Sequence, residues 1–230
     1  MSTPSSDPSA ASPPLDPLVL LAEMGHRVAN EYSLAIASIS LAAHRTHHPQ
    51  ARTALDAAAE RLRRYASAHR ALQAPLGGGA MDLSAYLREL CRAQVQAWLA
   101  ERNIAVTLVE SPVELDAERC WRVGMIVAEL VTNAARHAFD VNGGRVLVEV
   151  HMSDDEVTCR VSDDGGGWLA GAGSAAPIPG MGTRIIDALA LDLGGRIERR
   201  FTAAGARVRL SFPWRGPGTS PTATAGRGPR

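Results

Sequence analysis

The chain has 230 residues, 46% hydrophobic and 21% charged, an ordinary composition for a globular protein with one mid-sized domain or two small ones. Its 24 basic and 24 acidic residues give a formal net charge of zero, which excludes a protein-wide field for attracting nucleic acid or a basic partner. No apolar run approaches the roughly 20 residues that span a bilayer, and the amino terminus lacks the basic segment of a signal peptide. We therefore expect a cytoplasmic protein that binds neither nucleic acid nor a membrane, with free thiols at Cys91, Cys120 and Cys159.

The first half of the chain predicts a helical hairpin between residues 16 and 74. Residues 1–15, like residues 215–230 at the other end, are rich in proline and small residues, and we expect two disordered tails. Between them, a break at His48-Pro49 separates two Ala/Leu/Arg-rich segments, each with one apolar stripe at helical spacing. Because a lone hairpin cannot cover both stripes, we expect it to form a four-helix bundle in a homodimer or to pack on the rest of the chain.

Residues 80–214 mix helices with strands. Asp82 can cap a helix that runs to about residue 102, a second long helix covers residues 116–139, and a third covers 181–193. Alternation of apolar and polar residues predicts strands at 104–109, 145–152, 156–162, 196–201 and 207–212, with a loop over residues 165–179. The pattern indicates an α+β fold in which helices cover one face of a sheet with several antiparallel pairs.

Three short motifs in this second part carry residues that suit nucleotide chemistry. Glu129, Asn133 and His137 are spaced four apart on one helix face, where Glu and Asn oxygens suit a hard cation and Arg136 or His137 could contact phosphates. Asp163 precedes three glycines at a strand end, where a carboxylate can accept a hydrogen bond from an exocyclic amine. Each motif alone also fits a solvated helix face or an ordinary turn.

The third motif is Gly180-Met-Gly182-Thr183 at the start of a helix, where free N–H groups suit a phosphate. Together, the boxes ELVTNAARHAF, DDGGG and GMG resemble the GHKL-type ATP-binding domain shared by sensor histidine kinases and the gyrase, chaperone and mismatch-repair ATPases, a two-layer α/β sandwich. In the hairpin, the segment from Glu23 to Asn30 resembles the H-R-V-x-N phosphoacceptor box of the HisKA_2/HWE-like histidine kinases.

The resemblance implies roles for individual residues, with ATP and Mg²⁺ as cofactors. His26 is the implied phosphoacceptor, Asn133 the Mg²⁺ ligand with Glu129 beside it, and Asp163 the adenine-binding carboxylate. The ends of the flexible ATP lid are implied to lie at four glycines, Gly165, Gly167, Gly180 and Gly182. The implied partner is a response-regulator receiver domain, whose aspartate takes the phosphoryl group.

Periodicity places His26 on the solvent side of its helix, because it lies about 200° from both Met24 and Val28 of the apolar stripe. Glu23, one turn earlier, is the hypothetical base, and Asn30, one turn later, could serve dephosphorylation. We expect His69, which lies on an apolar stripe, to be a satisfied core histidine. A metal site at the three histidines of the hairpin tip is a weaker alternative, since no further ligand is in view.

Three other functions remain open. No sensory module precedes the hairpin, so we expect the signal to come from a separate sensor protein, or the chain to be a histidine phosphotransferase that relays phosphate between receiver domains with a vestigial ATP-binding domain. The short segment between the glycine boxes contains no basic side chain to contact the phosphates, which predicts modest nucleotide affinity. A pure interaction protein and a serine kinase of the anti-sigma type rank below these readings, because the latter does not need the hairpin.

Overall fold

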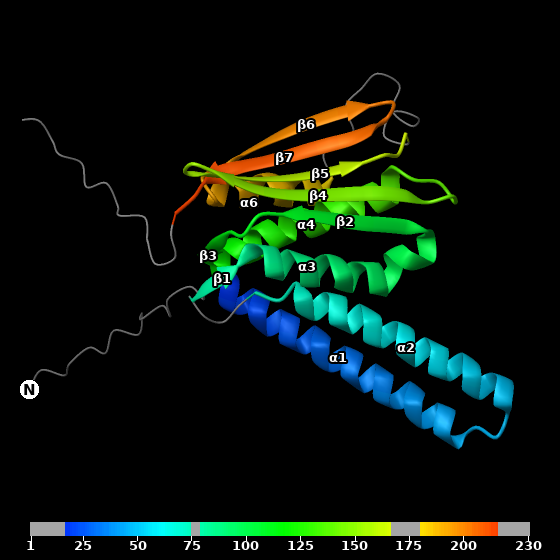
Figure 1. Cartoon of the computed structure of the whole chain (residues 1–230). Helices are drawn as coiled ribbons and strands as arrows, with labels where there is room; N and C mark the ends of the chain where they lie inside the picture. Colours follow the sequence, from blue (N-terminus) through cyan, green and yellow to red (C-terminus); the bar gives the residue numbers. More distant parts are fainter. Residues whose placement is uncertain (1–16, 75–78, 167–179, 216–230) are drawn as a thin grey trace, which may run out of the picture.

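The computed structural model describes residues 17–74, 79–166 and 180–215, with side chains from residue 23 onward. Both expected tails, apart from residue 215, and most of the expected loop at 165–179 lie outside the described residues. The described part has the predicted α+β fold, with a helical hairpin followed by a sheet and its helices (Figure 1).

The hairpin consists of α1 (Pro17–Arg45) and α2 (Pro49–Ala71), with proline in the first turn of α2, where its missing N–H costs no helical hydrogen bond. The C-terminal part of the α1 apolar stripe is half-buried against α2. In contrast, Met24 and Val28 at the N-terminal end are 62% and 39% exposed. A single chain therefore leaves part of this stripe uncovered.

Two helices of the second part begin at aspartate caps, of which Asp82 was predicted. The Asp82 carboxylate accepts hydrogen bonds from the backbone N–H groups of Ser84 and Ala85, and Asp116 accepts one from Arg119. The segment after Asp82 is an α-helix that continues through a π turn and a 3-10 turn. The elements are α3 (Leu83–Gln94), η1 (Val95–Leu99), η2 (Ala100–Arg102), α4 (Ala117–His137) and α6 (Met181–Asp192).

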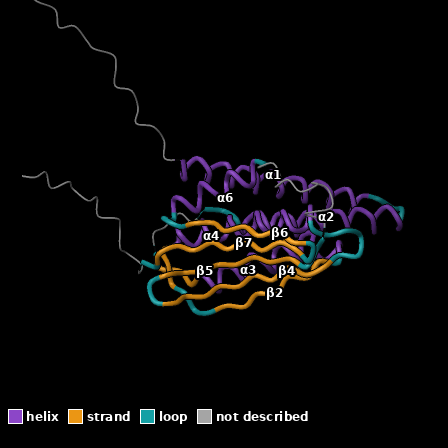
Figure 2. Tube along the Cα trace, turned by 90° about the horizontal axis from the view of Figure 1, so that it is seen from above, coloured by secondary structure: helices purple, strands orange, loops and turns teal. Residues whose placement is uncertain are grey.

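Two sheets form, one of them small. The larger has the order β2-β4-β5-β7-β6, seen side by side in Figure 2. Its β2–β4 pair is parallel, which the sequence analysis did not anticipate, and its other pairs are antiparallel, in line with the several antiparallel pairs predicted. The strands are β1 (Ala80–Asp82), β2 (Ile104–Glu110), β3 (Glu114–Asp116), β4 (Gly144–Ser153), β5 (Glu156–Asp163), β6 (Arg196–Thr202) and β7 (Gly205–Pro213), with β1 and β3 pairing separately.

The core lies between the larger sheet and the helices that cover one of its faces (Figure 1). Inward residues alternate with outward ones, as in β4, where Val146, Val148 and Val150 are fully buried. The hairpin packs through α2 on the outer side of α3 and the π turn. Among the described residues, no helix is both long and apolar enough to cross a bilayer.

Candidate functional site

Helix α4 carries the first motif at the boundary between core and surface. Ile126, Leu130 and Ala134 are buried, as the periodicity predicted, while Glu129 and Asn133 on the adjoining face are half-buried. Arg136 and His137 are exposed in the last turn, where positive charge interacts favourably with the helix dipole. The helix therefore presents oxygen donors near its middle and basic groups at its end.

The third motif lies directly beside the first. A Cβ added at Gly182 would come 2.7 Å from Glu129 Oε2 and 3.8 Å from Asn133 Nδ2. Thr183 is half-buried next to it, and Gly180 is an exposed N-cap without a side-chain cap, so the first turn of α6 keeps free N–H groups. The fold thus brings together two motifs about 50 residues apart in the chain, with the Glu129 carboxylate and the Asn133 amide beside a helix N-terminus.

The second motif holds its first carboxylate in a backbone cradle at the end of β5. Asp163 Oδ1 accepts hydrogen bonds from the N–H groups of Gly165 (3.2 Å) and Ala206 (3.1 Å). Gly205 has a φ of +126°, and a Cβ there would come 1.9 Å from the Asp163 carbonyl oxygen. Only glycine fits this position. The sequence analysis did not single out Gly205 or Ala206, although a glycine in the turn between two closing strands was the available signal.

The neighbouring carboxylate, Asp164, is occupied by Arg145. Its Oδ1 accepts from the Arg145 backbone N–H at 2.7 Å and its Oδ2 from Arg145 Nε at 3.0 Å. Partial burial raises the pKa of the Asp164 carboxyl, but these hydrogen bonds outweigh it and hold the pKa below its ordinary value. The structure therefore distinguishes two adjacent aspartates that the sequence presents alike.

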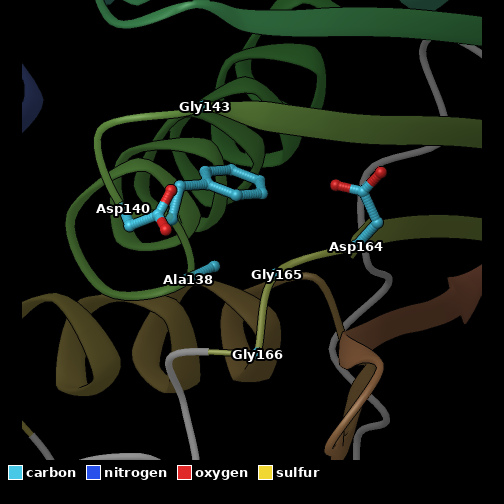
Figure 3. A pocket seen from close by; sticks show the side chains of 7 residues that line it. Ala138, Asp140, Gly143, Asp164, Gly165 and Gly166 are labelled. Atoms are coloured by element: carbon cyan, nitrogen blue, oxygen red, sulfur yellow. The ribbon is translucent and has the colours of Figure 1, made fainter.

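A cavity of about 460 Å³ lies where the loop after β5 meets the end of α4 (Figure 3). Asp140 and Asp164 flank it, with Gly165 and Gly166 along one side. A Cβ at Gly165 would come 2.2 Å from the carbonyl oxygen of Ala138, so the loop touches α4 backbone to backbone. Gly167, the last glycine of this motif, lies outside the described residues.

The hairpin residues are not part of this cluster. His26 is exposed on α1, as the helical spacing predicted, and Asn30 is exposed one turn later. The Glu23 carboxylate accepts a hydrogen bond from Arg27 Nε at 3.0 Å. The sequence analysis did not anticipate this ion pair, which competes with the hypothetical role of Glu23 as a base toward His26.

Among the other histidines of the hairpin, His69 differs from its expected role, and the weaker alternative of a metal site at His44, His47 and His48 finds no support. His69 is half-buried with its ring centroid 6.0 Å from that of Tyr32, but its buried Nδ1 has no hydrogen-bond partner in the described part, so the expectation of a satisfied histidine is wrong. Within residues 17–74, 79–166 and 180–215, no group of three or more His, Cys, Asp or Glu side chains could hold a metal ion. The three tip histidines therefore form no metal centre.

Comparison with known proteins gives two family matches. A family described as a histidine kinase-like ATPase domain matches residues 82–212, and a family described as histidine kinase matches residues 23–98. Blue-light-activated histidine kinase 1 of Erythrobacter litoralis is 30% identical over 198 residues, which cover 84% of this chain and 52% of that protein. The sensor histidine kinase PdtaS of Mycolicibacterium smegmatis is 30% identical over 151 residues, 65% of this chain and 30% of that protein.

Two solved structures share the fold. The histidine kinase domain of an Erythrobacter litoralis blue-light activated histidine kinase superposes with a TM-score of 0.54 at 24% identity, covering 80% of this chain and 95% of that one. A bacterial phosphotransferase superposes with a TM-score of 0.56 at 17% identity, covering 89% of this chain and all of that one. At these identities the likeness shows the fold alone.

The chain spans about half the length of the Erythrobacter relative and about a third of the Mycolicibacterium one. The ATPase-domain family covers more than half of this chain, and the second family covers most of the hairpin and its junction with that domain. The chain therefore belongs to the histidine kinases of the HisKA_2 type with a GHKL-like ATPase domain.

Proposed function

We propose that the chain acts in two-component signalling as an ATP-dependent histidine kinase that phosphorylates His26 and passes the phosphoryl group to a receiver-domain aspartate. The observation that carries this proposal is the convergence of the three motifs, with Gly182 against Glu129 and Asn133 and with Asp163 held in its backbone cradle. The exposure of His26 on α1 supports its role, because the imidazole must meet both ATP and a second protein.

The adenine ring binds at Asp163, whose carboxylate accepts a hydrogen bond from the exocyclic amine. Asp164 is paired with Arg145, and this favours Asp163 over Asp164 as the carboxylate that binds adenine. The triphosphate extends towards Asn133, with Arg136, His137 and the free N–H groups at Thr183 as its contacts and with Gly165, Gly167, Gly180 and Gly182 at the lid ends.

The residues present fit Mg²⁺. Asn133 and Glu129 lie side by side and carry an amide oxygen and a carboxylate, the hard oxygen ligands that Mg²⁺ prefers. Bound Mg²⁺ would take its remaining ligands from waters and phosphates. Such an ion neutralises charge on the phosphates during transfer.

Phosphoryl transfer breaks the bond from the γ-phosphorus to the bridging oxygen and forms a phosphorus–nitrogen bond to His26, with ADP as the leaving group. The proton on the other ring nitrogen passes to a base, which we assign to Glu23 once Arg27 has released it. We assign Asn30, one turn after His26, to dephosphorylation, in which a water molecule removes the phosphoryl group.

The proposal includes a homodimer, since Met24 and Val28 remain exposed on the apolar stripe in the single chain. It also places the reaction in the cytoplasm, where the three free, buried cysteines remain reduced. A receiver domain is the expected acceptor.

Labelling with γ-phosphate-labelled ATP and Mg²⁺ tests the proposal. We expect label on the wild type and on a His44→Ala control, which loses another exposed histidine of α1, but none on His26→Ala. The second candidate function is the phosphate relay. No label and no nucleotide binding, with phosphate accepted by His26 from a phosphorylated receiver, would establish that relay function and refute the kinase. Partner binding that is indifferent to His26, without any phosphate transfer, would indicate an interaction protein.

A further inference from the structure

The hairpin is fastened to the ATP-binding part at the C-terminal end of α2. The last carbonyl groups of a helix have no partners within the helix. Here the Tyr86 hydroxyl donates to the Ala71 carbonyl at 3.1 Å, and Trp121 Nε1 donates to the Leu72 carbonyl at 3.0 Å. Two side chains of the ATP-binding part therefore satisfy the end of a hairpin helix.

Both donors are fixed in place by their own surroundings. Trp121 is only 7% exposed in the second turn of α4. The Tyr86 ring lies against Gly124, where an added Cβ would come 2.4 Å from its Cε1, so α4 has a notch for this ring. Burial raises the pKa of the Tyr86 phenol, which keeps it a hydrogen-bond donor across the physiological range. The donors form a rigid anchor on α3 and α4.

The anchor also fixes the position of His26. Gln73, next to Leu72, donates from Nε2 to the Gly25 carbonyl at 3.0 Å, one residue before the phosphoacceptor. A second attachment lies farther along α2, where Arg61 and Arg64 pair with Glu101 at 3.2 and 2.9 Å. These ion pairs are partly exposed, so they contribute less to the free energy of hairpin docking than the hydrogen bonds of the buried anchor do.

The anchor holds His26 at the wrong end of α4 for its own nucleotide. Asn133 follows Trp121 by 12 residues, so the phosphate end of the site lies about 18 Å farther along the helix axis, at 1.5 Å per residue. Gly25, next to His26, is hydrogen-bonded to Gln73, and the neighbouring Leu72 is hydrogen-bonded to Trp121 in the second turn of α4, so His26 lies near the N-terminal end of that helix. Reacting atoms must approach to about 3–3.5 Å. In this arrangement His26 is out of reach of the chain's own ATP.

We propose that Tyr86 and Trp121 are positioning residues that hold the hairpin in a docked, non-transferring arrangement, and that autophosphorylation within one chain requires both hydrogen bonds to break. This inference rests on the proposed kinase function. Anything that pulls α2 away from α3 and α4 then raises the kinase rate, while the nucleotide site stays intact.

The test uses the full chain with the double substitution Tyr86→Phe and Trp121→Phe, which removes both donors and keeps aromatic rings in place. Tyr65→Phe, a half-buried α2 tyrosine with no hydrogen bond among the described residues, and Trp214→Phe, which loses an indole bond to the Glu114 carbonyl, are the matched controls. At saturating ATP we expect labelling of His26 to accelerate about tenfold in the double variant, with KM for ATP unchanged, because two hydrogen bonds no longer oppose undocking. The controls keep the wild-type rate.

A second measurement follows docking without catalysis. Spin labels at Ala57→Cys on α2 and Thr107→Cys on β2, both exposed positions, report the distance between the two parts, since the native thiols are buried. We expect one narrow distance distribution in the parent chain and a broad one in the double variant. A gain in rate with an unchanged KM for ATP, together with a broader distance distribution, separates positioning from simple stabilisation, because general damage would also weaken ATP binding.

Two results overturn the inference: a double variant that labels at or below the parent rate, or a distance distribution that stays narrow. Absence of label from the parent chain and every variant instead refutes the kinase proposal, and this inference with it. A parent chain that labels normally while the double variant does not respond refutes this inference alone.

Discussion

The glycines of the two boxes differ in what surrounds them, and alanine substitutions should separate their roles. At Gly165 an added Cβ would lie 2.2 Å from a backbone oxygen, that of Ala138. At Gly182 it would lie 2.7 Å from Glu129 Oε2, the mobile end of a side chain, and at Gly180 nothing lies within 4 Å. The methyl group of an alanine would therefore meet rigid backbone at Gly165, a movable side chain at Gly182 and open space at Gly180.

We expect Gly165→Ala to destabilise the fold. Ordinary contacts begin at 3.4 Å, so the loop after β5 or the end of α4 must shift by more than 1 Å (~1.2 Å), and such overpacking costs about 1–3 kcal/mol. For a chain of this size, this lowers Tm by roughly 3–10 °C. Differential scanning calorimetry of the two variants side by side measures the difference, with Gly180→Ala expected within about 1 °C of the parent chain.

Gly182→Ala should leave Tm almost unchanged, because Glu129 can rotate away. This rotation moves the Glu129 carboxylate away from Asn133 and so disrupts the proposed Mg²⁺ site. We therefore expect Mg²⁺-dependent affinity for a non-hydrolysable ATP analogue to fall about tenfold, or about 1.4 kcal/mol. Titration calorimetry with Mg²⁺ and with EDTA isolates this effect. Wild-type Tm for Gly165→Ala, or equal affinity loss for Gly180→Ala and Gly182→Ala, would refute this account of the boxes.

Three further predictions follow from single contacts. Asp163→Asn keeps an oxygen for the two backbone N–H groups but turns an amide donor toward the adenine amine, so nucleotide affinity should fall at least tenfold in calorimetry while Tm changes little. Asp116→Ala removes the N-cap of α4 and should lower the free energy of unfolding in urea by about 1 kcal/mol, whereas Asp116→Asn, which keeps a capping oxygen, should not. Burial raises three thiol pKa values to about 12, so each neutral thiol stabilises the fold fully below about pH 9, and between pH 9 and 12 stability falls by about 1.4 kcal/mol per pH unit per thiol. All 24 basic residues are arginines, so no lysine titrates there, but the buried Tyr86 phenol, whose pKa is also raised, adds its own slope above about pH 10. Alanine substitutions at Cys91, Cys120 and Cys159 should therefore flatten the pH dependence of the urea-measured free energy of unfolding between about pH 9 and 10, and a slope in that interval that survives the triple substitution contradicts the assignment.

Much of the fold could be predicted because local chemistry determines it. Asp82 caps its helix as expected, and the second helix begins where predicted, after Asp116, since a short carboxylate before an apolar-periodic segment satisfies otherwise unpaired N–H groups. The valines of β4 face the core because alternation defines the buried face of a strand. Alternation does not encode strand direction, however, and this is why the parallel pairing of β2 with β4 was missed. That pairing follows from the helix α4, which carries the chain back across the sheet.

Residues that act on backbone atoms left no comparable signal. Gly205 and Ala206 matter through an N–H group and the space where a side chain would clash, and Tyr86 and Trp121 donate to carbonyl groups of a helix end. Every residue offers such backbone groups, so no residue type marks the acceptor. Aromatic residues within a helix pattern otherwise indicate only core positions.

Helix α4 connects all of these features. Its second turn holds the end of α2 through Trp121, its middle carries Glu129 and Asn133, and its end meets Gly165 at the cavity. Because a helix of 21 residues fixes these positions about 1.5 Å per residue apart, neither end can move toward the other. A change that brings His26 to ATP must therefore move α2 relative to α3 and α4, or come from a second chain, and the length of α4 is itself the reason that the docked arrangement is inactive within one chain.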